Sequence, residues 1–255
     1  MRLATFNILH GRSPADRRVD LDRFAAAIKD LDADILALQE VDRDQPRSAL
    51  ADLTQVAADA MGAVDHRFVA ALAGTPGATW IAATGEEQPG TATYGIALLT
   101  RCPAASWQVT RMPAPPVHFL LWLREPHKVV MVREEPRVAV CAVLDTPVGE
   151  LTVVNTHLSY VPGWRRWQLR RLTRDLAAMP GPLILTGDLN MGPRPVGQIT
   201  GYRPLATGPT FPAAAPVRQL DHILLRGHLP GAAIGRAVRL PLSDHRALVA
   251  DFAED

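Results

Sequence analysis

Polar side chains stand inside, or at the ends of, six apolar stretches of this sequence. The stretches are ATFNILHG, DILALQEVD, LTVVNTHLS, LILTGDLN, RQLDHILL and LPLSDHRALV. A carboxylate, amide or imidazole placed there loses hydration at a cost of about 1–3 kcal/mol unless it is paired. The pattern therefore raises the question of which groups these side chains contact.

Each of these residues, taken alone, has a structural explanation. Asn7 can bond a neighbouring strand end, Glu40 can pair with Arg43, and a lone His157 is more often a satisfied core histidine than a catalyst. Six such stretches in one chain favour a different interpretation, because loops at strand ends are where α/β folds assemble active sites. The sequence therefore predicts that these polar side chains lie close together in the folded protein.

The residue types suit a hard cation and water chemistry. Glu40, Asp244 and Asn7, with Asp188 and Asn190 as further candidates, offer oxygen ligands and no thiolate, which favours Mg²⁺ or Mn²⁺. Imidazoles among them suit proton transfer or stabilisation of a phosphate oxyanion. The sequence contains no G-x-S-x-G, Walker, G-x-G-x-x-G or H-E-x-x-H motif. Metal-assisted attack by water is the chemistry that remains.

Composition describes a globular chain of balanced charge. The chain has 255 residues, of which 47% are hydrophobic, and carries 27 Lys+Arg against 26 Asp+Glu. This balance argues against a strongly basic nucleic-acid-binding domain, although it leaves a local basic groove open. No compositional shift marks a linker, so we expect one domain over residues 1–255. Cys102 and Cys141 lack disulfide or zinc spacing and are expected in the core.

The start of the chain, MRLATFNILHG, lacks a basic region followed by a long apolar run. No segment approaches the roughly 18 uninterrupted apolar residues of a membrane-spanning helix. We therefore expect a cytoplasmic monomer without a membrane span.

The elements that must position the polar groups are mainly strands. Three helical patterns interrupt them, at residues 21–31, at 50–61 and from about Trp164 to Met179. Many strands with few, widely separated helices predict an α/β (α+β) sandwich in which helices cover packed sheets. TPVG at 146–149 predicts a hairpin, and segments 74–92 and 113–136 are expected as surface loops. The expected strands are Leu3–Ile8, Ile35–Val41, Arg67–Leu72, Tyr94–Arg101, Ser106–Met112, Arg137–Leu144, Leu151–His157, Leu183–Leu185, Leu220–Leu225 and Ala247–Phe252.

The sequence resembles the endonuclease/exonuclease/phosphatase superfamily of metal-dependent phosphoesterases. The matching stretches, in the family's order between residues 3 and 252, are TFNILHG, LQEVD, YGIALLTR, NTHLS, GDLN, LDHILL and SDHRALV. The resemblance implies a four-layer α/β/β/α sandwich of two packed, mainly antiparallel sheets flanked by helices. It also implies that Glu40 is the principal Mg²⁺ ligand, assisted by Asn7 and Asp244.

The same resemblance implies the catalytic roles. Asp188 and Asn190 position or deprotonate the attacking water and contact the scissile phosphate. His245 lies beside that phosphate, oriented by Asp221, and His157 donates to a phosphate oxygen. Family members have been described with either the His245 or the Asp188 equivalent as general base, and the sequence does not decide between them.

Three further residues are candidates for substrate contact. Tyr94 opens YGIALLTR, but a buried strand tyrosine is the stronger interpretation. Arg137 matches a Glu/Arg neighbourhood of the family, and an ion pair with Glu134 or Glu135 is at least as well supported as a phosphate contact. Asn155 shares its strand end with His157. His222 follows Asp221, so alternation sends it to the opposite face of its strand.

The substrate is a phosphate ester whose class stays open. His157 stands where the abasic-site endonuclease branch has tyrosine, so NTHL resembles instead the deoxyribonuclease-like, sphingomyelinase, inositol-phosphatase and deadenylase branches. The arginine-rich stretch at 163–174 fits either a nucleic-acid-tracking edge or a solvated helix face. The apolar excursion at 117–137 fits a folded-back hairpin better than a membrane contact.

These features rank three functions. We expect a phosphodiesterase, most plausibly a nuclease acting on nucleic acid. A phosphomonoesterase, or a sphingomyelinase- or inositol-phosphate-type enzyme on a metabolite or lipid, is the alternative. A catalytically silent binding module ranks last, because every expected site position carries a competent residue.

Overall fold

The computed structural model describes residues 1–116, 118–123 and 128–252. In this part of the chain the strands form a seven-stranded sheet in the order β14-β15-β1-β2-β5-β3-β4, a six-stranded sheet in the order β12-β13-β11-β10-β9-β6, and the pair β7-β8. The bounds are β1 Arg2–Asn7, β2 Ile35–Arg43, β3 Asp65–Gly74, β4 Trp80–Ala82, β5 Thr93–Thr100, β6 Ala104–Met112, β7 His118–Leu123, β8 Lys128–Arg133, β9 Arg137–Thr146, β10 Gly149–His157, β11 Leu183–Asp188, β12 Arg203–Ala206, β13 Asp221–Arg226, β14 Ala233–Val238 and β15 Ala247–Phe252.

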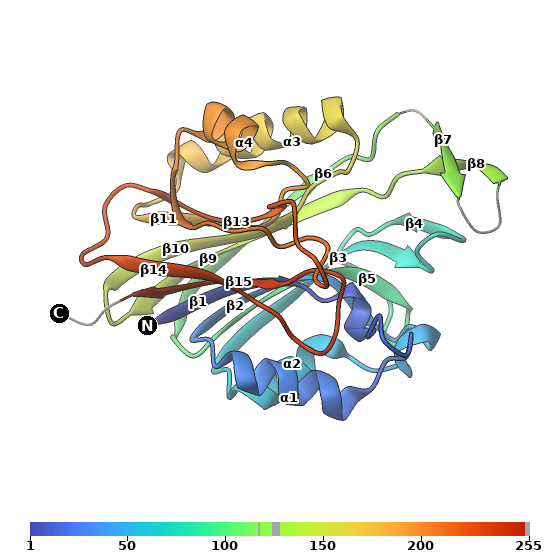
Figure 1. Cartoon of the computed structure of the whole chain (residues 1–255), viewed down its shortest axis with the longest axis horizontal. Helices are drawn as coiled ribbons and strands as arrows, with labels where there is room; N and C mark the ends of the chain where they lie inside the picture. Colours follow the sequence, from blue (N-terminus) through green and yellow to red (C-terminus); the bar gives the residue numbers. More distant parts are fainter. Residues whose placement is uncertain (117, 124–127, 253–255) are drawn as a thin grey trace.

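Helices cover the outer face of each large sheet (Figure 1). Helices α1 and α2 lie against the first sheet, and α3 and α4 lie against the second. The four-layer α/β/β/α sandwich implied by the sequence is confirmed. The helices are α1 Leu21–Leu31, α2 Leu53–Met61, α3 Pro162–Asp175 and α4 Pro193–Thr200, with short 3-10 turns η1 Leu9–Gly11, η2 Pro46–Ser48 and η3 Leu176–Ala178.

Three apolar clusters hold the layers together. The central cluster fills the space between the sheets and includes Ile35, Val140 and Ile184. Phe24 of α1 belongs to the cluster on the outer side of the first sheet, and Leu169 of α3 to that on the second. Burying apolar side chains in this way stabilises the fold by roughly 25 cal/mol per Å².

Each of the two large sheets contains one parallel pair of strands, and polar residues lie at the carboxyl ends of these strands. β1 pairs with β2 in parallel, and β10 pairs with β11 in parallel, while the other strand pairs of the described ranges are antiparallel. The carboxyl ends of parallel neighbours meet at the same edge of a sheet. Asn7 and Gln39 are register partners in one sheet, His157 and Asp188 are partners in the other, and the hydrogen bond from Asn7 to Asp188 joins the two pairs.

The ten expected strands and the three expected helical segments are present, with boundaries shifted by a few residues. Helix α4 was not predicted from the sequence, because Pro193, Pro195 and Gly197 are residue types typical of a turn. Proline in a first helical turn is tolerated, since the amide hydrogen that it lacks has no intrahelical partner there.

The segments expected as surface loops are partly paired. β4 lies within 74–92 and pairs with β3, and β7 pairs with β8 as a hairpin at one end of the molecule (Figure 1). Residues 117 and 124–127 of the excursion lie outside the described ranges. Among the described residues, no helix is long and apolar enough to cross a membrane.

Candidate active site

The inward faces of the central strands change from apolar to polar toward one end of the sandwich. On β10, Leu151 and Val153 belong to the core between the sheets, and Asn155 and His157 follow them at the same two-residue period. On β11, Ile184 is followed in the same way by Thr186 and Asp188. The polar residues of the six-stranded sheet therefore lie together at this end of the sandwich.

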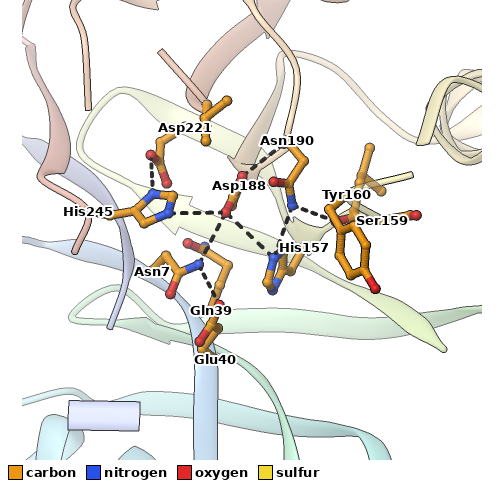
Figure 2. A network of polar contacts seen from close by, with 12 residues as sticks. Asn7, Gln39, Glu40, His157, Ser159, Tyr160, Asp188, Asn190, Asp221 and His245 are labelled. Atoms are coloured by element: carbon orange, nitrogen blue, oxygen red, sulfur yellow. Dashed lines mark hydrogen bonds and ion pairs between the residues drawn. The ribbon is translucent and has the colours of Figure 1, made fainter. Parts of the chain in front are cut away.

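Asp188 is the centre of this polar group (Figure 2). Its Oδ2 accepts a hydrogen bond from Asn7 Nδ2 at 3.1 Å, and its Oδ1 accepts one from the Asn190 backbone amide at 2.8 Å. His157 Nε2 lies 3.5 Å and His245 Nε2 lies 3.8 Å from Oδ2. The two sheets and the loop after β11 thus converge on a single carboxylate.

Glu40 owes its position to a bulge in β2. The register between β2 and β5 shifts between Gln39 and Val41, and Glu40 has a φ of 57°. An extra residue in the left-handed region bends the strand and re-aims its side chain. The Glu40 carboxylate accepts a hydrogen bond from Asn7 Nδ2 at 3.1 Å, which connects it to the Asp188 group.

Asn7 bridges the two carboxylates as a donor. Its Oδ1 accepts a hydrogen bond from the Leu9 backbone amide at 3.1 Å, so its amide nitrogen faces Glu40 and Asp188. The amide orientation is assigned from this hydrogen-bond network. Direct ligation of a metal by Asn7 Oδ1 stays a prediction, because that oxygen is engaged here with backbone.

Glu40 and Asp244 have the chemistry that a divalent cation requires. Burial raises the pKa of Glu40, and the Asp244 carboxylate raises it further, while the bond from Asn7 opposes the shift. Within the described residues no Lys, Arg or His forms an ion pair with either carboxylate. Two carboxylates without an ion-pair partner, one of them buried, fit Mg²⁺ or Mn²⁺.

Asp188, Asp221 and His245 form a second group of potential ligands, whose atoms lie within 4.8 Å of one another. His245 Nδ1 lies 2.8 Å from Asp221 Oδ2. Although burial lowers the pKa of His245, the Asp221 carboxylate raises it to about 10. Burial and Asp221 raise the pKa of Asp188 to about 7. The hydrogen bond between Asp221 and His245 joins two of these residues in a relay, and the three together are also a candidate metal site.

His157 is held in one tautomer by Arg137. Arg137 Nη1 lies 3.3 Å from His157 Nδ1, and a guanidinium can only donate, so Nδ1 accepts and the ring proton is on Nε2. Burial, with the charges of Arg137 and His245, lowers the pKa of His157 well below its usual value. The result is a neutral imidazole whose Nε2–H faces Asp188 Oδ2, while the nearby Asn190 Nδ2, 3.3 Å from Nε2, donates to the carbonyl of Leu158.

The three candidate substrate contacts have different environments. Arg137 forms the expected ion pair with Glu134 at 3.0 Å. Tyr94 is buried and lines a small cavity with Arg137 and His157, at the edge of the site. Asn155 is fully buried between the sheets.

Asn155 joins the two sheets and has no amide hydrogen left for a substrate. Its Nδ2 donates to the carbonyls of Leu38 and Ala97 at 2.9 and 2.8 Å, and its Oδ1 accepts from Gln39 Nε2 at 2.7 Å. The substrate contact expected for Asn155 stays a prediction, and this geometry gives Asn155 a structural role. A two-residue period predicts the face of a residue but not its depth between two sheets.

Three further residues support the site, and of these only Gln39 was not singled out from the sequence. Ser243 accepts from the His245 amide and donates to the Asn7 carbonyl, which ties two predicted site residues together. Glu134 accepts from Arg137 and from the hydroxyl of Ser159. Gln39 holds Asn155. Ser243 could be recognised from the sequence because it lies in SDHR, two residues before the histidine.

His222 behaves as the alternation of β13 predicts. It lies on the opposite face from Asp221, and its Nε2 is 2.8 Å from the carbonyl of Met191. The cysteines are buried and unpaired, as expected.

A sandwich of this architecture, with carboxylates and imidazoles at one end of its sheets, defines a class of hydrolases that act on phosphate esters. The model of the endonuclease/exonuclease/phosphatase family matches residues 4–245, and the chain belongs to this family. The family is generally dependent on divalent metals. No curated protein matches the sequence.

Solved structures share the fold at low sequence identity. The endonuclease/exonuclease/phosphatase from Beutenbergia cavernae DSM 12333 is 23% identical with a TM-score of 0.69, over 98% of this chain and 70% of that chain. Truncated Caenorhabditis elegans TDP2 is 17% identical with a TM-score of 0.59, over 99% and 97%. The mannosyl-6-phosphatase Bt3783 of Bacteroides thetaiotaomicron VPI-5482 is 16% identical with a TM-score of 0.62, over the full length of both. Likeness at this level describes the fold alone.

Proposed function

We propose that the protein is a Mg²⁺- or Mn²⁺-dependent phosphodiesterase, with nucleic acid as the favoured substrate. The observation that carries the proposal is the Asn7 side chain, which donates to both Glu40 and Asp188. It places the candidate metal carboxylate next to the carboxylate that faces both imidazoles. We also propose that the chain acts as a monomer and as a single domain.

Glu40 and Asp244 would hold the cation, and Asn7 would orient Glu40. A divalent cation bound there supplies electrostatic stabilisation of the charge that develops on the phosphate and on the leaving oxygen. Asp188 and Asn190 would orient the attacking water. Asp188 Oδ2 and His245 Nε2 are 3.8 Å apart, so a water between them would contact both, and Asp188 would accept its proton where Asp221 keeps His245 charged.

The imidazoles supply fixed donors. His157 would donate its Nε2–H to a phosphate oxygen, and Arg137 would keep it in that tautomer. Asp221 would hold the ring of His245 beside the phosphate. Donors that are already oriented lower the barrier because they need no reorganisation during the reaction.

The test is a plasmid-nicking assay with Mg²⁺ and with EDTA, run beside a panel of phosphomonoesters. We expect nicking with Mg²⁺, none with EDTA, and little release of phosphate from monoesters. Turnover of monoesters alone would favour the alternative of a phosphomonoesterase, the activity named for Bt3783. Absence of turnover on both panels with Mg²⁺ and Mn²⁺ would leave only a binding module.

A further inference from the structure

Two arginines that the catalytic scheme does not use lie at the rim of the site. Arg165 is in the first turns of α3, directly after the loop that follows His157. Arg218 is in the loop before β13, which carries Asp221. Both residues adjoin the six-stranded sheet, in which β10 and β13 lie on either side of β11 and His157 and Asp221 are the register partners of Asp188. Arg165 and Arg218 therefore reach the same rim, where the charge of Arg218 acts on Arg165.

Both arginines are held in place by neutral groups. Arg165 Nη1 donates to the carbonyl of Tyr160 at 3.2 Å. The guanidinium of Arg218 lies 6.0 Å from the centre of the Phe211 ring, and that ring lies 5.0 Å from the ring of His245. Arg218 is thus connected to the catalytic histidine through one aromatic ring.

Neither arginine has a carboxylate partner within the described ranges. The acids close to Arg165 are Asp188 and Glu134, and both are already bonded elsewhere. Burial, together with the charges of Arg218 and Arg166, lowers the pKa of Arg165. Positively charged guanidinium groups that lie together without a carboxylate partner favour the binding of an anion at this rim.

We propose that Arg165 and Arg218 form a second anion-binding subsite, which takes a phosphate group of the substrate other than the one that is hydrolysed. Paired guanidinium groups bind phosphate oxygens through several directed hydrogen bonds. The inference rests on the proposed function and narrows it to substrates with at least two phosphates. A single-stranded polynucleotide and a small bisphosphate share this chemistry.

The kinetic test compares one-phosphate and two-phosphate substrates. Wild type, Arg165→Ala and Arg218→Ala are assayed with Mg²⁺ on bis(4-nitrophenyl) phosphate and on the 5′-phosphorylated dinucleotide pTpT. We expect each variant to lose at least tenfold in kcat/KM on pTpT and less than twofold on bis(4-nitrophenyl) phosphate. Equal losses on both substrates, or no loss on pTpT, would overturn the subsite.

Arg170→Ala is the matched control. Arg170 is exposed on the same helix and has no ion pair among the described residues, but it lies five residues from Arg165 and so points to a different side of α3. Its removal changes the net charge by the same amount. We expect its kcat/KM on pTpT to stay within twofold of wild type, and a tenfold loss would mean that general charge explains the effect.

An equilibrium measurement separates the subsite from the proposed activity. In EDTA, calorimetry compares thymidine 3′,5′-bisphosphate with thymidine 5′-monophosphate. Wild type should bind the bisphosphate at least tenfold more tightly, and this preference should vanish in Arg165→Ala and Arg218→Ala. Equal affinities in wild type would contradict the subsite. Absence of turnover on bis(4-nitrophenyl) phosphate in wild type would instead count against the proposed function.

Two further substrates distinguish the source of the second phosphate. Oligothymidylate and fructose 1,6-bisphosphate are compared in wild type and in Arg165→Ala. For the polynucleotide, each lost phosphate contact should reduce the slope of log affinity against log salt by about 0.7. A loss of affinity of at least tenfold that is confined to one substrate identifies its class as the source of the second phosphate. No loss of affinity for either substrate would overturn the proposal.

Discussion

Gly187 lies so close to the carbonyl oxygen of Thr156 that a Cβ atom on Gly187 would overlap it. The two residues are register partners in the parallel pair β10–β11, and Gly187 has a φ of 131°. The close approach carries Asp188 toward His157. Glycine is therefore required at this position by the geometry of the site and not only by the turn that follows.

Gly187→Ala should destabilise the protein by about 2–4 kcal/mol, because it combines overpacking with a backbone conformation unfavourable for L-residues. The midpoint of urea unfolding measures this. Gly192→Ala is the control, since Gly192 has a φ of −72° and open space around its Cβ position. We expect a change below about 1 kcal/mol there, and similar losses at both glycines would contradict the steric explanation.

Glu40→Gln should separate stability from metal binding. Without metal the variant should be at least as stable as wild type, because a buried carboxylate whose pKa is raised by burial is replaced by a neutral amide. A ligand at 100 times its Kd stabilises a protein by about 2.7 kcal/mol, so Mg²⁺ should raise the unfolding temperature of wild type and not of the variant.

Glu150→Gln is the matched control for Glu40, since Glu150 is exposed at the start of β10. It should keep the stabilisation by Mg²⁺. A full Mg²⁺ response in Glu40→Gln would remove Glu40 from the proposed metal site.

His245→Ala should lower kcat by about 10²–10⁴-fold and leave metal binding intact, because the residue acts in proton transfer or oxyanion stabilisation. Asp221→Asn should lower kcat by about 10–100-fold, because Asp221 orients His245 through a hydrogen bond. His222→Gln is the control: it keeps a donor for Met191 on the opposite face and should stay near wild-type activity. Wild-type turnover in His245→Ala would exclude its proposed role.

The sequence predicts which faces and strand ends carry the chemistry, because alternation and strand boundaries are local properties. Glu40, Asp188 and His157 were found in this way, and the structure brings them together (Figure 2). The bulge that re-aims Glu40 is not visible in the sequence, since its register depends on pairing with β5. The ion pair of Glu134 with Arg137 is local and was expected, but its hydrogen bond from Ser159 was not, because Ser159 comes from the loop after β10.

Asn155→Ala tests whether Asn155 has a structural role or contacts the substrate. It removes the partner of Gln39 and leaves the carbonyls of Leu38 and Ala97 without a donor in a dry interior. Unsatisfied buried groups cost about 1–3 kcal/mol each, so we expect a loss of about 2–5 kcal/mol in urea unfolding. KM of the folded enzyme should stay within about twofold. A large rise in KM with unchanged stability would favour the substrate contact.

His10 should make a contribution to stability that is lost as the pH falls from 7 to 5. Burial, with the charges of Arg47 and Arg12, lowers the pKa of His10 to about 3. An unfolded histidine titrates near 6.5, so stability is present above that pH and is lost as the pH falls toward the folded pKa. The slope is below about 1.4 kcal/mol per pH unit, because part of the ring is solvated. His10→Asn keeps a residue that tolerates the φ of 47° and should flatten the dependence of urea unfolding on pH. An unchanged slope in His10→Asn would assign the loss to other groups.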